Sequence, residues 1–169
     1  MSNFQDAKTW FKMALSDIKR IISNFKEPDY AACIYRIQFC CEKILKGLIL
    51  LYGAQFKKIH TPSIIIKTEI LATQSKLSKA EKYQLTEIID DASILEDLST
   101  IPRYGLEENG QFIEPEAIYD KNSVLSILPQ LINIIKNLIE ILKTKKISMW
   151  KQFIEDFENG YKGLQDLVA

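Results

Sequence analysis

The stretch that most constrains the fold is RIQFCCEKILKGLILLYG, residues 36–53, because it is too apolar to be an ordinary surface helix. Its large apolar side chains form a broad stripe at 100° per residue, and further apolar residues lie on the opposite side. Polar residues interrupt the stretch at helical spacing: Gln38, Glu42, Lys43 and Lys46. A helix of this kind is either the centre of a bundle or shared with a second subunit.

Apolar residues at three- and four-residue intervals predict further helices along the chain. We expect helices near residues 4–25, 28–52, 61–73, 78–98 and 122–145, and a short amphipathic one near 148–158. Thr61 before Pro62 marks one helix start, and Ser78 with Glu81 forms a capping box at another. Pro129 either kinks the last long helix or marks its true start. The pattern predicts an all-α, up-and-down bundle of four to five helices with a short C-terminal extension.

Residues 99–121 hold two Pro and two Gly and show no periodicity. A connection that long inside a compact domain is functional or is ordered by tertiary contacts. We find no convincing strand pattern here or elsewhere in the chain.

The totals exclude several classes of protein. With 169 residues the chain fits one domain, and 22 basic residues against 22 acidic ones leave no overall positive field for nucleic acid. There is no glycine-rich phosphate loop, and one histidine with three cysteines on one helical segment cannot form a zinc set of recognisable spacing. We therefore expect no metal and no cofactor.

The cysteines Cys33, Cys40 and Cys41 cannot form a disulfide framework, and they indicate small core residues in a reducing compartment. No secretory signal and no run of about 20 apolar residues is visible. We therefore expect a cytoplasmic protein with no membrane contact.

Two further polar features stand out. His60 lies just before the helix start at Thr61, where the helix dipole favours the neutral imidazole, and it either bonds a loop carbonyl or takes part in a site. Arg103 is the one basic residue among the acids of residues 99–120, where it either holds the loop down or binds a phosphate.

Several segments in order resemble the HEPN domain family, named for higher eukaryotic and prokaryotic nucleotide-binding proteins: AKTWFKMALSDIKRI, DYAACIYRIQFCCEKILKGLILLYG, KKIHTPS and PRYG. The resemblance covers roughly residues 4–143, so we divide the chain into a bundle over 1–146 and an amphipathic extension over 147–169, packed on the bundle or on a partner. It implies a helical bundle that is frequently a homodimer and whose gene often accompanies a minimal nucleotidyltransferase in a toxin–antitoxin-like pair. The residues that it carries over to a nucleotide- or partner-binding surface are Gln38, Glu42, Lys46, His60, Arg103 and Tyr104.

Many HEPN proteins are metal-independent ribonucleases that use an arginine and a histidine four to six residues apart. This chain has His60 as its one histidine, and no arginine precedes it at that distance. The resemblance therefore implies a non-catalytic or weakly active partner of a nucleotidyltransferase, with a nucleotide or RNA end at the shared surface. The alternatives are a ribonuclease that uses His60 and Arg103, and a purely structural dimeric assembly module.

The expected helix positions also predict where Arg103 could lie. If residues 99–121 fold back over the mouth of the bundle, Arg103 joins the polar strip of the second helix. There we expect it to pair with Glu42, because an arginine in a partly dry cleft needs a carboxylate.

Overall fold

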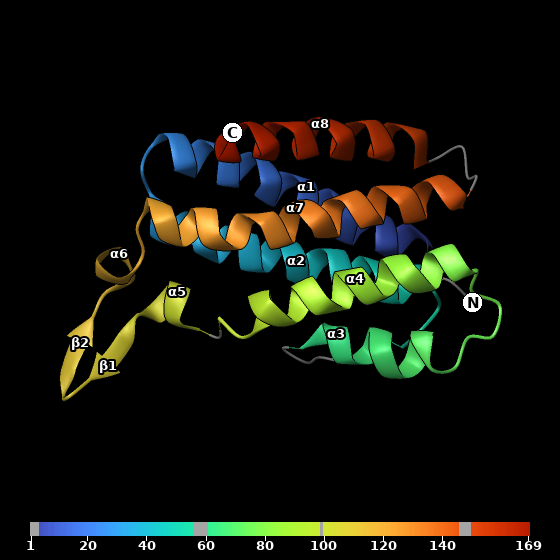
Figure 1. Cartoon of the computed structure of the whole chain (residues 1–169), viewed down its shortest axis with the longest axis horizontal. Coiled ribbons are helices and arrows are strands. Elements are labelled where there is room, and N and C mark those ends of the chain that lie inside the picture. The colour runs from blue at the N-terminus through green and yellow to red at the C-terminus, as the bar shows by residue number, and fades with distance from the viewer. Residues whose placement is uncertain (1–3, 56–60, 99, 146–149) are drawn as a thin grey trace.

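A computed structural model of the chain describes residues 4–55, 61–98, 100–145 and 150–169, and it is mostly helical (Figure 1). The long helices are α1 (Phe4–Lys26), α2 (Tyr30–Leu51), α4 (Lys79–Glu96), α7 (Lys121–Thr144) and α8 (Lys151–Val168). The shorter elements are α3 (Pro62–Ile65), the π-helix η1 (Ile66–Leu71), α5 (Ile101–Tyr104), strands β1 (Leu106–Glu108) and β2 (Gln111–Ile113), and α6 (Pro115–Ile118). The predicted helical bundle is confirmed.

Helix α2 is the central helix, and it packs against α1, α7, α5, α4 and α3. Asp29 caps its start by accepting a hydrogen bond from the Ala32 N–H at 3.1 Å. The three cysteines are free and buried, as predicted for core residues. Burial raises the pKa of the Cys41 thiol well above its usual range, so this thiol stays protonated at neutral pH.

Helices α1 and α2 form the most extensive helix pair of the bundle. Gly47 on α2 makes room for the ring of Phe11 on α1, because a Cβ at Gly47 would lie 2.4 Å from Phe11 Cε1. The same ring makes edge-to-face contacts with Trp150 at 5.8 Å and Phe157 at 6.2 Å between centroids. Phe11 therefore joins α1, α2 and the C-terminal part of the chain.

Asp120 caps the start of helix α7, because its side chain accepts a hydrogen bond from the Ser123 N–H at 2.8 Å. Pro129 lies inside the helix and does not mark its start. By length and composition α7 could cross a membrane, but half of its most apolar window is buried inside the fold (50%). Its apolar side chains belong to the core of the bundle.

The ends of three helices meet at Glu81, in the first turn of α4. Its carboxylate accepts hydrogen bonds from Lys145 Nζ at 2.6 Å, Tyr52 Oη at 3.1 Å and the Ser78 N–H at 3.1 Å. The capping box predicted from Ser78 and Glu81 is confirmed. Burial raises the pKa of Glu81, but the hydrogen bonds from Lys145 and Ser78 outweigh it and lower the pKa to about 2.

The expectation that the chain has no strands is wrong, because β1 and β2 form an antiparallel hairpin within residues 99–121 that projects from one end of the bundle (Figure 1). Asn109 and Gly110 connect the strands, with φ of 53° and 75°. A two-residue Asn-Gly turn with both φ positive is a strong hairpin signal, although each strand has only three residues. The strands are too short to show an alternating pattern.

Helix α8 is longer than the predicted helix near 148–158, because it continues through Gly160 and Gly163 to Val168. These glycines face α1. A Cβ at Gly160 would lie 3.0 Å from Ile18 Cγ2, and one at Gly163 would lie 2.9 Å from Ile22 Cδ1. They permit close packing and do not end the helix. The buried face of α8 covers α1 and α7 (Figure 1).

We expect Gly47→Ala to destabilise the protein. The added methyl overlaps the Phe11 ring at a cost of about 1–3 kcal/mol, which exceeds the helix-propensity gain of at most about 1 kcal/mol for replacing glycine. Urea unfolding measures the loss. In a Phe11→Leu background the substitution should cost much less, and an equal cost in both backgrounds would contradict the proposed overlap.

We expect Glu81 to stabilise the fold in a pH-dependent way. Its pKa is lower in the folded state, about 2 against an ordinary 4.5, so its stabilising contribution is full above pH 4.5 and is lost as the pH falls towards 2. The difference in unfolding free energy between wild type and Glu81→Gln should therefore be largest near neutral pH and shrink over this window. Glu155→Gln, at an exposed position of α8, serves as the control for loss of a surface carboxylate and should change the unfolding free energy by less than about 0.5 kcal/mol.

Candidate functional site

A cavity of about 390 Å³ opens between α2, α4 and α5, and we call it the α2–α4 cavity. The described residues that line it are Gln38, Cys41, Glu42, Thr61, Glu96, Asp97, Thr100 and Arg103. Three of the residues predicted to share a site, Gln38, Glu42 and Arg103, therefore lie around one cavity. The short helix α5 brings Arg103 there, because α5 packs against α2.

The guanidinium of Arg103 lies among aromatic rings. Its Cζ is 5.0 Å from the ring centroid of Phe39, 5.4 Å from that of Tyr104 and 5.7 Å from that of Tyr35. These distances are within the range of cation–π attraction. The Nε atom of Arg103 is buried and has no hydrogen-bond partner among the described residues.

The expected ion pair between Arg103 and Glu42 is wrong for the described part of the chain, where Glu42 pairs with Lys46 one turn further along α2. A glutamate four residues before a lysine is the favourable order on a helix, so the local pair forms without help from α5. Lys46 also lies 4.8 Å from the ring centroid of Trp10. It is not among the residues that line the cavity.

Glu96, at the end of α4, is the acid of the cavity that connects two helices. Its carboxylate accepts hydrogen bonds from the Ser63 N–H at 3.1 Å and from the Ser63 hydroxyl, and so ties α4 to α3. Burial raises the pKa of Glu96, the hydrogen bonds from Ser63 oppose the rise, and the charges of Asp97 and Glu42 add to it. Burial is the largest of these causes of the raised pKa, and the two neighbouring carboxylates add a smaller one.

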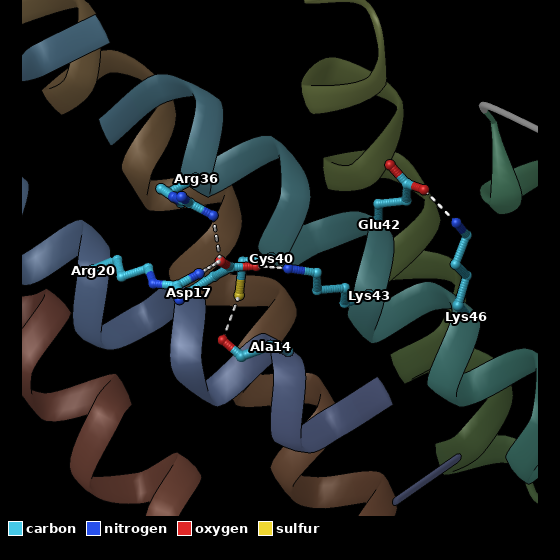
Figure 2. A network of polar contacts seen from close by, with 8 residues as sticks. All are labelled: Ala14, Asp17, Arg20, Arg36, Cys40, Glu42, Lys43 and Lys46. Atoms are coloured by element: carbon cyan, nitrogen blue, oxygen red, sulfur yellow. Dashed lines mark hydrogen bonds and ion pairs between the residues drawn. The ribbon is translucent and has the colours of Figure 1, made fainter. Parts of the chain in front are cut away.

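On the α1 side of α2, the carboxylate of Asp17 is fully buried and lies between cations (Figure 2). Its Oδ1 accepts a hydrogen bond from Arg36 Nη1 at 3.2 Å and is 3.6 Å from Arg20 Nη1. Lys43 donates to its Oδ2. One carboxylate thus faces three cations, which leaves a surplus of positive charge on this side of α2.

Aromatic rings accompany these cations, and the set forms what we call the cation–aromatic strip: Trp10, Tyr35, Arg36, Phe39, Lys43, Lys46 and Arg103. Arg36 lies 5.1 Å from the ring centroid of Tyr35, and Lys43 lies 5.3 Å from that of Phe39. Arg103 belongs both to the strip and to the wall of the α2–α4 cavity. The two sides of α2 therefore differ in charge and meet at Arg103.

The remaining predicted site residues are Tyr104 and His60. Tyr104 is 65% exposed and lines a separate hollow with Tyr35 and Pro102. His60 falls outside the described residues, although the next residue in the chain, Thr61, lines the α2–α4 cavity. Within the described ranges, no group of three or more His, Cys, Asp or Glu could hold a metal ion.

Sequence reasoning missed Asp17 and Glu96. Asp17 occupies a position three residues after Ala14 and four before Ile21, on the apolar face of α1, and a charge inside such a stripe is a signal of a buried pair. Glu96 likewise follows Ala92 by four residues, at the border of the buried face of α4. The sequence positions of Asp17 and Glu96 therefore indicate that both carboxylates are buried, but they do not indicate which residues pair with them.

Comparison with known proteins shows the family of this chain. The HEPN domain family matches residues 7–145, which is most of the chain, so the chain belongs to the HEPN domain family. A protein of Methanocaldococcus jannaschii described as a "putative toxin" is 27% identical over 143 residues, which cover 85% of this chain and 92% of that protein. No solved structure matches the chain at a significant level.

We expect Asp17→Asn to destabilise the protein by about 2–4 kcal/mol, because it leaves Arg36 and Lys43 without their buried counter-charge. Chemical denaturation measures the change. The matched control is Glu140→Gln, which removes an exposed carboxylate paired with Lys143 and should cost less than about 0.5 kcal/mol. Similar losses for both variants would show that the buried position of Asp17 carries no special weight.

Proposed function

We propose that this chain is the HEPN component of a toxin–antitoxin-like pair in the cytoplasm. In this proposal it binds a minimal nucleotidyltransferase protein and is itself non-catalytic or weakly active. Membership of the HEPN family supports the proposal, and so does the relative described as a toxin. The missing arginine–histidine spacing supports the non-catalytic part.

The observation that carries the proposal is the position of Arg103. Its guanidinium is held by three aromatic rings at the wall of the α2–α4 cavity, while its buried Nε–H lacks an acceptor among the described residues. Exposed Tyr104 lies beside it, and arginine and tyrosine are enriched at the centres of protein interfaces.

A nucleotide or RNA end belongs to the same proposal, on the cation–aromatic strip. Aromatic rings stack on bases, and the surplus of positive charge around Asp17 suits phosphates.

We also keep the homodimer as a proposal. The tail is the less suitable surface for it, because the apolar face of α8 already packs against α1 and α7.

One observation favours the ribonuclease as a second candidate. Thr61, which directly follows His60 in the chain, lines the same cavity as Arg103. A ribonuclease needs a general acid or base and a cation at one phosphate. The carboxylates of Glu42, Glu96 and Asp97 work against phosphate binding inside that cavity.

The test is to look for a minimal nucleotidyltransferase encoded beside this gene and to measure its binding to the full chain by calorimetry. We expect Arg103→Ala to weaken binding about ten- to a hundredfold, which corresponds to about 1.4–2.7 kcal/mol. Lys136→Ala removes an exposed cation of α7, far in sequence from the site, and should leave the affinity unchanged. Unfolding curves of both variants exclude misfolding as the cause.

A parallel incubation with single-stranded RNA separates the alternatives. Intact RNA together with tight partner binding supports the proposal. RNA cleavage that is lost in both His60→Ala and Arg103→Ala overturns the non-catalytic part and favours the ribonuclease. If a neighbouring nucleotidyltransferase is missing or does not bind, and RNA does not bind either, the structural assembly module remains.

A further inference from the structure

The β1–β2 hairpin has two open edges. The strands pack mainly on each other, and the hairpin projects from one end of the bundle beside α5 and α6 (Figure 1). Among the residues that the structure describes, no backbone hydrogen bond joins either strand to another element. The outer side of each strand therefore presents unpaired N–H and C=O groups, and such an edge is a template for pairing with a further strand.

The register of the hairpin determines which residues point outward. Glu108 and Gln111 flank the two-residue turn, and Glu107 faces Phe112 in the next pair. The turn joins its flanking residues by a hydrogen bond, and hydrogen-bonded pairs alternate with non-hydrogen-bonded pairs along an antiparallel ladder. The backbone N–H and C=O groups of Glu107 therefore point to the open edge of β1, and those of Phe112 point to the open edge of β2.

The two edges differ in charge. Strand β1 carries Glu107 and Glu108, whereas the three residues of β2 carry no charge. A two-fold axis at the open edge of β1 would place Glu107 of two copies opposite each other, and like charges in directly opposite positions are destabilising. A two-fold axis at the open edge of β2 places Phe112 of two copies opposite each other, and aromatic pairs across strands are stabilising.

The side chain of Phe112 is available for such a pair. It is 69% exposed, which is the largest exposed fraction among the large apolar side chains that the structure describes. Natural proteins protect open strand edges with charged residues or prolines, and Gln111, Phe112 and Ile113 provide neither. An exposed aromatic residue at the centre of an uncharged, open edge indicates a strand that pairs with another strand.

We infer that β2 pairs with β2 of a second copy of this chain, so that two hairpins form a four-stranded antiparallel sheet around a two-fold axis at Phe112. A second copy fits this edge because two-fold symmetry makes the pairing of β2 with itself antiparallel. The N–H and C=O groups of Phe112 then bond to the same groups of Phe112 in the other copy. The inference names the surface of the homodimer, and it rests on the proposed function for that dimer alone.

The pairing surface is continuous with the candidate functional site. Only Gly105 separates β1 from α5, the helix that carries Arg103. Pairing of the hairpins would therefore bring two helices that carry Arg103 into one assembly. We expect a weak dimer, with a dissociation constant of about 10–100 μM, because strands of three residues bury far less than the roughly 800 Å² per partner of stable complexes.

Sedimentation equilibrium of the full chain over a series of concentrations measures the association. We expect the average mass to rise from the 19.5 kDa of one chain towards that of a dimer. Phe112→Glu and Phe112→Lys each place like charges opposite each other, and each should weaken the dimer at least about tenfold. An equal mixture of the two variants places opposite charges across the axis and should restore association to within about threefold of the wild-type value.

The matched controls are Tyr83→Glu and Tyr83→Lys. Tyr83 is an exposed aromatic residue of α4, outside the hairpin, and the same changes there should leave the association unchanged. Unfolding curves of all four variants verify that they fold, which we expect because both side chains are exposed.

The outcomes separate this inference from the proposed function. Restored association in the mixture, with neither Phe112 variant associating alone, supports pairing at β2. A wild-type dimer that both Phe112 variants retain overturns the inference and leaves the homodimer to another surface. A wild-type chain that stays monomeric up to millimolar concentration overturns both the inference and the homodimer. Binding of the nucleotidyltransferase is measured separately, and its failure beside an intact dimer overturns the proposed partner alone.

Discussion

The buried carboxylate of Asp17 fixes how α1 lies on α2. It is fully shielded from water and reaches Arg36 and Lys43, two residues seven positions apart on α2. A shift of either helix along the other would leave a buried charge unpaired, at a cost of several kcal/mol. The Sγ of Cys40, between these two cations in sequence, donates to the Ala14 carbonyl at 3.5 Å and adds a contact in the same register. The packing of the Phe11 ring against Gly47 depends on the same register of α1 on α2.

Sequence periodicity was sufficient for the helices because their apolar stripes and caps are local signals. The caps at Ser78 and Asp120 are determined by residues three positions apart, and both are present in the structure. The hairpin and the true end of α8 were missed for physical reasons. The hairpin has strands too short to alternate, so its signal was confined to Asn109 and Gly110. The end of α8 was placed too early because a glycine that permits close packing against Ile18 looks, in sequence, like a glycine that ends a helix.

The candidate site was only partly predictable, because its members come from elements far apart in the chain. The polar strip of α2 could be read directly, and Gln38 and Glu42 do line a cavity with Arg103. The surroundings of Arg103 could not be read from the sequence, because we considered only carboxylates and a phosphate as its partners. The structure surrounds it with the rings of Tyr35, Phe39 and Tyr104 instead. Glu96 and Asp97 enter the site through the packing of α4 on α2, which no local pattern specifies.

The division of α2 into two chemically different sides bears on where phosphate chemistry could occur. Inside the α2–α4 cavity, a phosphate near Arg103 would also lie near the carboxylates that share the wall, and their repulsion would offset the attraction of the guanidinium. On the cation–aromatic strip, the same guanidinium lies beside Tyr35 and Phe39, and Arg36 and Lys43 add positive charge. An RNA end would therefore approach Arg103 from the strip. Because one guanidinium cannot serve two large ligands without contact between them, a partner protein that contacts Arg103 would affect RNA binding on the strip.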